Sequence, residues 1–321
     1  MGVTIVIGGQ YGGEGKGKVT YWFAKERDIN IAVRVGGTNA GHTVVDENNN
    51  KFILRQLPTP SVLKNRYCVL SAGSYIDVDI LFKEMKETGL DSDKLLIDEN
   101  AMIITDSDKE LESKGNLRNE IGSTLSGTGA SVIRRVARGK NTTLAKDIEA
   151  LKPFIADTKK YLRSKIQEGQ KVIIEGTQGF GLSLLHSPHY PYTTSRDTTA
   201  SAFLAEAGLS PFDVDEIIMV IRAFPIRVEG NSGALENEIT WDELGQEPEL
   251  SSVTKKVRRI ANFDSEIVKK AIETNKPSKI VLNHIGYMTS EKQEDFISKV
   301  EYQLGQKIDF IGMDDKCLVA K

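Results

Sequence analysis

An apolar strand that runs into a glycine-rich loop and then a helix constrains this chain more than any other feature. Residues 3–18 read VTIVIGGQYGGEGKGK: β-branched residues come first, then six glycines from Gly8 to Gly17, together with Lys16 and Lys18. The residues that follow have the apolar spacing of a helix. This order presents backbone N–H groups and a positive helix end to a phosphate, and Lys16 would add a point charge. The sequence therefore predicts a phosphate-containing ligand.

This loop is not a Walker A motif, which has Gly, four further residues and then Gly-Lys-Ser/Thr. Gln10 stands where the first Gly of that motif belongs, and Gly17 replaces the hydroxyl residue that would hold Mg²⁺. A glycine-rich turn without a ligand is the alternative interpretation. Two lysines at a strand-to-helix junction favour the phosphate site.

Strands and helices are expected to alternate along the rest of the chain. Apolar runs predict strands at 30–35, 67–70, near 95, 102–105, 171–176, 216–223, 279–285 and 309–313, and a hairpin over 42–57. Helical spacing predicts helices at 77–86, 145–168, 198–207, 264–272 and 295–304, and a basic helix with Arg134, Arg135 and Arg138 after the loop at 122–129. The alternation predicts an α/β fold with a largely parallel central sheet and helices on both faces, in a single domain over 1–321. The loops that follow strands should bind ligands at the carboxyl edge of the sheet.

Charge and cysteine content narrow the partners and the compartment. Lys and Arg number 42 and Asp and Glu 45, a net charge of -3 that gives no reason to expect a nucleic-acid or membrane partner. Two distant cysteines, Cys68 and Cys317, favour a reducing compartment over a zinc site or a disulfide framework. The N-terminus leads straight into a core strand, and no apolar run approaches the ~18 residues that span a bilayer. We therefore expect a cytoplasmic protein without a signal peptide.

Five motifs together resemble one enzyme family across essentially the whole chain. GGQYGGEGKGK, GGTNAGHT, IGSTLSGTG, EGTQGFGLSL with YPYTTS, and VTKKVRR follow one another in the order seen in adenylosuccinate synthetases. The resemblance implies the P-loop-NTPase-like fold of that family, Mg²⁺ as cofactor and a homodimer. It also implies a two-step ligase reaction. GTP phosphorylates the 6-oxygen of inosine monophosphate (IMP), and the amine of aspartate then displaces the phosphate.

The resemblance also assigns roles to individual residues. Lys16 resembles the phosphate-binding lysine, His42 the general acid on the transferring phosphate, and Gln178 the contact to the purine and its 6-oxygen. The triphosphate site implied in this way comprises Gly13, Gly15, Lys16, Gly17, Lys18, Gly41, His42, Thr43, Arg258, Asn283 and Gly286. The monophosphate site comprises Asn39, Ala40, Thr124, Gln178, Thr194, Lys256 and, from the partner subunit, Arg138. Aspartate would bind Thr254, Lys255, Lys256, Arg258 and Arg259, and Mg²⁺ would bind the carbonyl of Gly41 and the position of Gly13.

Three positions depart from the family's pattern. Gly13 stands where the family has its catalytic Asp, the general base on purine N1 and a Mg²⁺ ligand; a missing side chain is expected to open space beside purine C2, where guanine carries an amino group. The family's GTP-selecting Thr-Lys-Leu-Asp is replaced by residues 283–286, Asn-His-Ile-Gly, so its guanine-binding carboxylate is absent. Lys255-Lys256 replaces a Gly-Arg pair whose Arg lies near the ribose 2′ side, which is compatible with a deoxyribose.

These departures favour a branch of the family found in phages whose DNA contains 2-aminoadenine. The resulting hypothesis is a ligase that joins L-aspartate to C6 of dGMP with ATP or dATP as phosphoryl donor, giving 2-amino-2′-deoxy-N6-succinyladenylate. An ordinary adenylosuccinate synthetase that uses IMP and GTP is the first alternative. Because the catalytic Asp is absent, a catalytically silent nucleotide-binding homologue is the second.

Overall fold

Strand β1 (Val3–Gly8) lies in the interior of a large sheet, in the computed structural model that describes residues 2–321. The sheet has 11 strands in the order β16-β15-β14-β10-β1-β9-β2-β5-β6-β8, with β7 beside β5. Every pair is parallel except β15 with β16. This confirms the largely parallel sheet. The other strands are β2 (Ile31–Gly36), β5 (Tyr67–Ile76), β6 (Leu95–Asp98), β7 (Met102–Ile103), β8 (Ile155–Ala156), β9 (Val172–Glu175), β10 (Val214–Arg222), β14 (Lys279–Asn283), β15 (Phe310–Gly312) and β16 (Val319–Ala320).

Alternate residues of β1 pack against helices on opposite faces of the sheet. Ile5 and Ile7 belong to a core cluster with Phe203 of α7 (Ala200–Ala207), and with residues of α9 (Ser265–Asn275) and α10 (Ser290–Leu304). Val6 belongs to a second cluster with Phe23 of α1 (Lys16–Glu26). Burial on both faces explains why this strand reads as a continuous apolar run rather than an alternating one. The predicted helices on both faces are confirmed.

The hairpin predicted over 42–57 is present as β3 (His42–Val45) and β4 (Lys51–Leu54), paired antiparallel with His42 opposite Leu54. Gly17 lets α1 approach it closely. An ideal Cβ on Gly17 would lie 2.9 Å from His42 Cβ and 2.9 Å from the carbonyl oxygen of Thr43. The absence of a side chain at this position therefore lets the hairpin pack against the start of α1, next to the glycine-rich loop.

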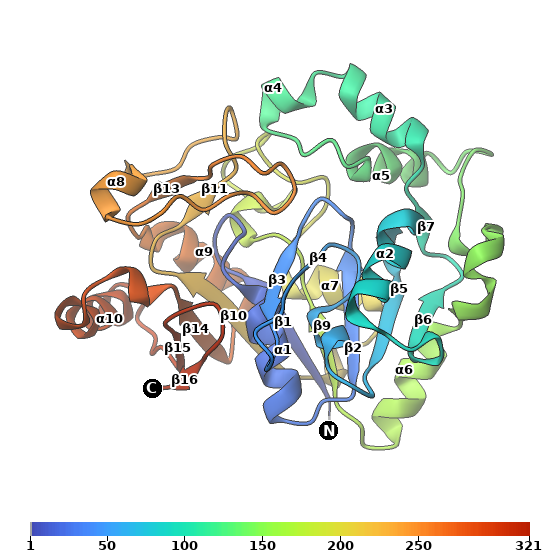
Figure 1. Ribbon diagram of the computed structural model, residues 1–321, viewed down its shortest axis with the longest axis horizontal. Helices are drawn as coiled ribbons and strands as arrows, with labels where there is room; N and C mark the ends of the chain where they lie inside the picture. Colours follow the sequence, from blue (N-terminus) through green and yellow to red (C-terminus); the bar gives the residue numbers. More distant parts are fainter. Residues whose placement is uncertain (1) are drawn as a thin grey trace.

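Two groups of elements have no counterpart among the sequence-based expectations. One is a small antiparallel sheet of β11 (Ile226–Arg227), β13 (Arg259–Ala261) and β12 (Glu238–Ile239), together with α8 (Trp241–Leu244), which follows β12 in the chain. The other is the helix pair α3 (Asp106–Lys114) and α4 (Leu117–Ile121), which precedes α5 (Thr128–Ala137). Figure 1 shows both groups over the same edge of the main sheet.

The single helix expected over 145–168 is wrong. The first half forms short 3₁₀ turns at Ala145–Asp147 and Glu149–Phe154 and then β8, and only α6 (Thr158–Gln167) is α-helical. Pro153 lacks an N–H and would clash with the preceding turn, so the apolar spacing cannot continue as an α-helix. Arg138 likewise falls outside the basic helix: α5 ends at Ala137, and Arg138 caps it with φ 53°.

Helix α2 (Val78–Thr88) and helices α7, α9 and α10 confirm the remaining helical predictions, with boundaries that differ by a few residues. Among residues 2–321, no helix is long and apolar enough to cross a membrane.

Candidate active site

A cleft of about 630 Å³ lies where the strand-following loops meet. Its lining comes from the glycine loop after β1, the segment after β2, the loop after β9, the α4–α5 region and the segment before β13. The carboxyl ends of parallel strands share one edge of a sheet, so these loops converge although they are far apart in sequence. The predicted site residues that line the cleft are Gly13, Lys16, Asn39, Ala40, Gly41, His42, Thr124, Gln178, Thr194 and Arg258.

The glycine loop is held in shape by the buried carboxylate of Glu14. Its Oε1 accepts hydrogen bonds from the backbone N–H groups of Gln10 (3.2 Å) and Gly12 (2.8 Å), and its Oε2 accepts from Lys16 Nζ at 2.7 Å. Gly15 begins α1 with φ 90°, a conformation that favours glycine. Because Glu14 is fully buried and bound to three donors, it braces the loop and cannot serve as the missing base at position 13.

His42 is positioned by a buried ionic group at the end of β9. Its Nδ1 lies 2.6 Å from Glu175 Oε1, and Arg34 contacts the same oxygen. The second oxygen of Glu175 accepts from Thr59 Oγ1 at 2.6 Å and from Thr59 N at 2.8 Å. Burial alone would raise the pKa of Glu175, but the charge of Arg34 and the hydrogen bonds from His42 and Thr59 lower it to about 2. Nδ1 lies closer to the ionised Glu175 than to Arg34 Nη1, which is 3.0 Å away, so we assign the proton of a neutral His42 to Nδ1, which leaves Nε2 free.

The pKa of His42 is lowered to about 4, first by burial and then by the charge of Arg34, although Glu175 opposes the shift. The folded protein therefore keeps this imidazole neutral, while the unfolded chain binds a proton as the pH falls below 6.5. We expect the free energy of unfolding to fall by about 3 kcal/mol from this group between pH 6.5 and 4. Urea unfolding across this pH range checks the prediction. His42→Asn should flatten the slope, and an unchanged slope in that variant would contradict it.

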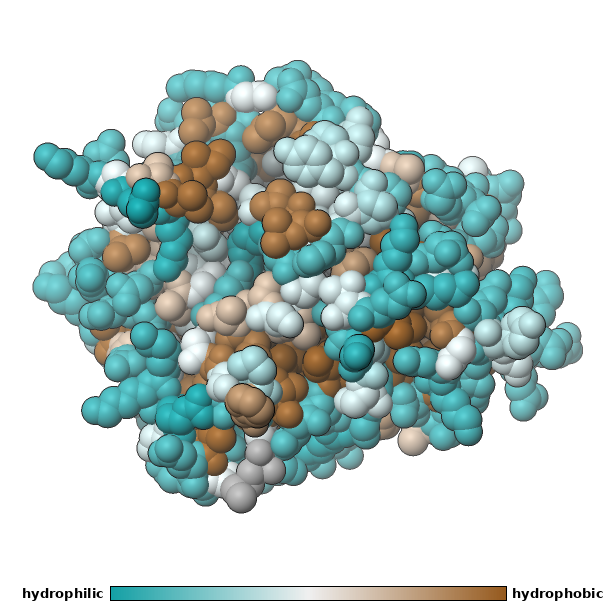
Figure 2. All heavy atoms as spheres, turned by 180° about the vertical axis from the view of Figure 1, so that it is seen from behind, coloured by the Kyte–Doolittle hydropathy of each residue, from teal (hydrophilic) through white to brown (hydrophobic). Residues whose placement is uncertain are grey.

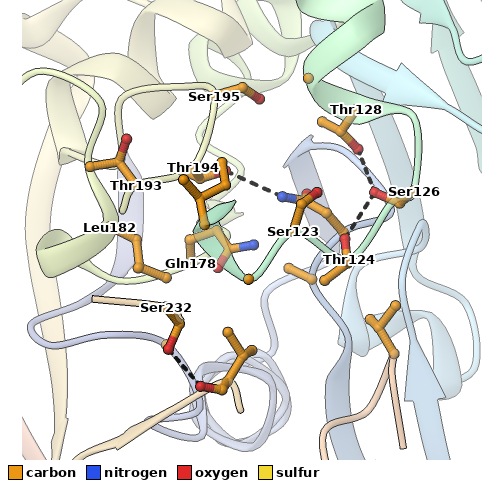
Figure 3. Close-up of a pocket in the computed structure, with 18 of the residues that line it drawn as sticks. Ser123, Thr124, Ser126, Thr128, Gln178, Leu182, Thr193, Thr194, Ser195 and Ser232 are labelled. Atoms are coloured by element: carbon orange, nitrogen blue, oxygen red, sulfur yellow. Dashed lines mark hydrogen bonds between the residues drawn. The ribbon is translucent and has the colours of Figure 1, made fainter. Parts of the chain in front are cut away.

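The part of the cleft predicted for the monophosphate is lined with hydroxyl and amide groups. Asn39 Nδ2 donates to Thr194 Oγ1 at 3.2 Å, and a chain of hydroxyls joins Thr124 to Ser126 (3.3 Å) and Ser126 to Thr128 (3.1 Å). Figure 3 shows Thr194, from the loop after β9, facing Thr124, Ser126 and Thr128, from the segment at the start of α5, across the pocket. Neutral donors on both sides suit a phosphate ester or a sugar.

Glu112 of α3 organises the loop that carries Thr124. Its carboxylate accepts from the N–H groups of Gly127 (2.7 Å), Gly129 (2.7 Å) and Ala130 (3.2 Å) at the start of α5. A negative side chain at a helix N-terminus satisfies donors that have no partner within the helix. Glu112 therefore holds the hydroxyl-bearing loop against α5.

Arg258 is the best-placed cation of the predicted aspartate site. It lines the cleft, and within residues 2–321 its guanidinium has no hydrogen-bond or ion-pair partner. Arg259, by contrast, is paired with Glu238 through two bonds of 2.8 and 2.6 Å and also donates to the carbonyl of Gly233. A role for Arg259 in binding aspartate stays a prediction, and it would require the pair with Glu238 to open.

The other predicted aspartate ligands lie outside the cleft lining. Thr254 Oγ1 donates to Glu229 at 3.3 Å, and Lys255 and Lys256 are exposed. Their backbone is nevertheless fixed by mutual hydrogen bonds, with Lys255 N to Ser251 O at 3.0 Å and Ser251 N to Lys256 O at 2.8 Å. These three residues stay predictions.

Several residues predicted for the triphosphate serve the packing around the glycine loop. Asn283 is fully buried, and its Nδ2 donates to the carbonyl of Glu14 at 2.7 Å. Lys18 donates to the carbonyl of Asp314 at 2.6 Å, and burial lowers its pKa to about 8. The Nδ2 group of Asn283 therefore braces the loop, and the role of Asn283 in binding the triphosphate stays a prediction. Four other residues predicted for the triphosphate site do not line the cleft: Gly15, Gly17, Thr43 and Gly286.

The space expected beside Gly13 is filled. An ideal Cβ at Gly13 would lie 2.6 Å from Cδ1 of Ile226 and 3.3 Å from Nη1 of Arg258, and φ is 71°. The loss of the family's Asp has not left an opening on this side of the loop; the prediction of open space is wrong. The apolar end of Ile226 takes that volume.

Sequence reasoning missed the residues that hold the site rather than touch a ligand: Arg34, Glu112, Glu175, Arg222, Ile226 and Glu249. Arg222 is fully buried, donates to the carbonyl of Gly13 at 2.9 Å and pairs with Glu249. A charged residue inside or at the end of an apolar strand, as in NIAVRV and KVIIEG, was the available signal.

Residues 2–321 contain no cluster of three or more His, Cys, Asp or Glu side chains that could hold a metal ion. A carbonyl is a hard oxygen ligand of the kind Mg²⁺ accepts, and Gly41 offers one at the cleft. The donor set therefore fits a Mg²⁺ ion that takes most of its ligands from substrate phosphates and water.

A parallel sheet with a phosphate loop, a lysine and a positioned histidine in one cleft defines a nucleotide-dependent enzyme of the α/β class. A family model described as adenylosuccinate synthetase matches residues 5–145 and 140–314. The chain belongs to the adenylosuccinate synthetase family, whose members are ligases that form a C–N bond.

Curated relatives agree over nearly the full length. The adenylosuccinate synthetase of Methanococcus aeolicus is 35% identical over 97% of this chain and 96% of its own. That of Methanocaldococcus jannaschii is 36% identical, covering 96% and 93%.

Solved structures confirm the fold. The succinoaminodeoxyadenylate synthetase (PurZ) of cyanophage S-2L, bound to dGMP and to dATP as an energy donor, matches with a TM-score of 0.87 and 27% identity, covering 99% of this chain and 95% of its own. The fully ligated adenylosuccinate synthetase of Plasmodium falciparum matches with a TM-score of 0.90 and 20% identity, covering 100% of both chains.

Proposed function

We propose that this enzyme joins L-aspartate to C6 of dGMP, with ATP or dATP as phosphoryl donor. The observation that carries the proposal is the glycine at position 13, where the family's pattern has the Asp that acts on purine N1. The cyanophage synthetase, whose solved structure contains dGMP and dATP, supports the same substrates. The product would be 2-amino-2′-deoxy-N6-succinyladenylate.

The proposed reaction has two steps, phosphoryl transfer and then displacement of the phosphate. In the first, the guanine 6-oxygen attacks the γ-phosphorus; the new O–P bond replaces the bond to ADP, and the N1 proton leaves. In the second, the aspartate amine attacks C6, inorganic phosphate leaves and the nitrogen loses a proton. Mg²⁺, when bound with the triphosphate, neutralises charge that develops on its phosphates.

Lys16 and His42 are the groups that we assign to the transferring phosphoryl. Lys16 lines the cleft from the start of α1, where its charge and the helix N-terminus attract phosphate oxygens. His42 offers Nε2, because Nδ1 is bound to Glu175. The negative charge of a bound triphosphate would raise the pKa of His42 from its low value in the free protein, so that Nε2–H could donate to the phosphoryl oxygen.

The choice of ATP or dATP over GTP rests on Gly286. The family's guanine-selecting strand ends in an Asp at this position, and glycine cannot accept from guanine N1–H and N2–H. Loss of such a doubly accepting carboxylate should weaken guanine preference by several kcal/mol. Gly286 has no side chain that could replace this acceptor.

We also propose that the enzyme is a homodimer in which Arg138 reaches the partner's monophosphate site. Arg138 is exposed beyond the end of α5 and has no side-chain partner within residues 2–321. Ile133 and Val136 of the same helix are 68% and 70% exposed, and Leu185 of a neighbouring cleft loop is 71% exposed. Figure 2 shows apolar side chains gathered on the upper part of the molecule, where α3 to α5 lie. Burial of these side chains by a second copy would remove apolar surface from water.

The alternative of an ordinary adenylosuccinate synthetase acting on IMP with GTP is favoured by the archaeal relatives at 35–36% identity. The alternative of a silent homologue is disfavoured by two intact pairs at the cleft, Lys16 with Glu14 and His42 with Glu175.

Phosphate release with aspartate present decides among these functions. We expect turnover with dGMP and ATP or dATP, and at least about tenfold lower kcat/KM with IMP or with GTP, which is a difference of about 1.4 kcal/mol. GMP tests the sugar, and omission of aspartate controls for simple hydrolysis. Turnover confined to IMP with GTP would establish the ordinary enzyme, and no turnover with any pair would establish the silent homologue.

A further inference from the structure

Two features of position 13 oppose a side chain there: its backbone conformation and a neighbouring residue. Its φ of 71° lies in the left-handed region that favours glycine, and an ideal Cβ would lie 2.6 Å from Ile226 Cδ1 and 3.0 Å from Ile226 Cγ1. Gly12, the preceding residue, also has a positive φ, of 87°, but its Cβ would meet nothing closer than 3.7 Å. The obstruction at Gly13 therefore belongs to Ile226 and not to the loop conformation alone.

The backbone is held on both sides of this contact, and the Ile226 side chain is buried. The carbonyl of Gly13 is held by Arg222 Nη1 at 2.9 Å, and Arg222 is paired with Glu249, which also accepts from Tyr287 at 2.6 Å. Ile226 is 1% exposed and lies in β11, paired with Ile260 of β13. A packed interior transmits such a clash instead of absorbing it.

We propose that Ile226 is a specificity-determining residue of this enzyme. Its side chain occupies the place that the Cβ of a carboxylate residue at position 13 would take, so the loop presents only its backbone to the cleft at that position. Gly13 and Ile226 act as one unit, and a carboxylate at 13 becomes usable only when Ile226 is made smaller. The steric half of this proposal is independent of substrate, whereas its consequence for dGMP against IMP rests on the proposed function.

A double-mutant cycle on thermal unfolding tests the steric half. Gly12→Ala and Gly13→Ala both place a Cβ at a positive φ, so their difference isolates the contact with Ile226. We expect Gly13→Ala to lower Tm by at least about 3 °C more than Gly12→Ala, and Ile226→Ala to remove that difference. Equal Tm values for Gly12→Ala and Gly13→Ala, or a difference that persists with Ile226→Ala, would overturn the proposal.

Activity with IMP and with dGMP tests the consequence for substrates. Gly13→Asp alone should lose turnover with both nucleotides, whereas Gly13→Asp with Ile226→Val should recover turnover and raise the ratio of IMP to dGMP turnover at least about tenfold over the parent enzyme. Val keeps the β-branch of the strand but lacks Cδ1, the closest atom. A single variant Gly13→Asp that already uses IMP well would overturn the role of Ile226. If the cycle on Tm holds and the parent enzyme rejects dGMP, the proposed function fails and the steric coupling stands.

Discussion

Replacing Glu175 with glutamine should lower kcat by about 10²-fold or more, the range expected when a general acid or base loses its function. Glutamine has nearly the same shape, but its amide does not require a donor from His42 Nδ1. The imidazole could then take either tautomer, and Nε2 would no longer be the defined free nitrogen. Steady-state kcat at saturating substrates measures the loss.

The same substitution should also destabilise the fold, because Arg34 is 1% exposed and its charge would lose its buried partner. Removing one member of a buried ion pair costs roughly 3–5 kcal/mol, and urea unfolding at pH 7 would show it. Kinetics must therefore be measured under conditions where the variant remains folded.

Two controls separate positioning from general damage. Thr59→Val removes one donor to Glu175 Oε2 but leaves the contact of Oε1 with His42, so kcat should fall less than about tenfold. In a His42→Asn background, Glu175→Gln should add little further loss of kcat, because the two residues act through one imidazole. Fully additive losses would show that Glu175 acts independently of His42.

The sequence contained enough to predict the layered architecture because burial leaves a strong pattern. β1, β2, β9 and β14 are almost entirely buried, so their β-branched runs could be recognised without any partner strand. Helix α3 escaped prediction because its residues DSDKELESK are mostly charged and show no apolar stripe. The helix expected across Pro153 shows the opposite error, in which a spacing pattern was followed through a residue that ends helices.

The site residues also fall into two groups, those that the sequence could locate and those that it could not. The residues proposed to contact a ligand stand in local motifs, so the resemblance pointed to Lys16, His42 and Gln178, which line the cleft. The groups that position them come from distant strands and have no motif of their own: Glu175 reaches His42 from β9, and Ile226 reaches Gly13 from β11. The empty space inferred at Gly13 could not have been corrected from sequence, because what fills it depends on the three-dimensional packing of β11.

Exchanging Arg258 and Arg259 for methionine, one at a time, should separate a ligand-binding arginine from a structural one. Methionine keeps the length and apolar stem of the side chain and removes its charge. Arg258 lines the cleft and has no partner within residues 2–321, so its charge is available to the two carboxylates of aspartate. Each charge-assisted hydrogen bond lost is worth about 1.5–3 kcal/mol, which predicts a fall in kcat/KM for aspartate of about 10- to 150-fold in Arg258→Met.

Arg259→Met should leave kcat/KM for aspartate within about threefold and lower the free energy of unfolding by about 1 kcal/mol, because this side chain is committed to Glu238 at the rim. Aspartate dependence of the initial rate at saturating nucleotides measures the first effect, and urea unfolding the second. Arg258→Lys should recover only part of the loss, since lysine cannot make two parallel bonds to a carboxylate. If Arg259→Met instead proved the more damaging for aspartate, the Glu238 pair would have to open during binding, and the clamp would be made by a rearranged loop rather than by the cation that already faces the cleft.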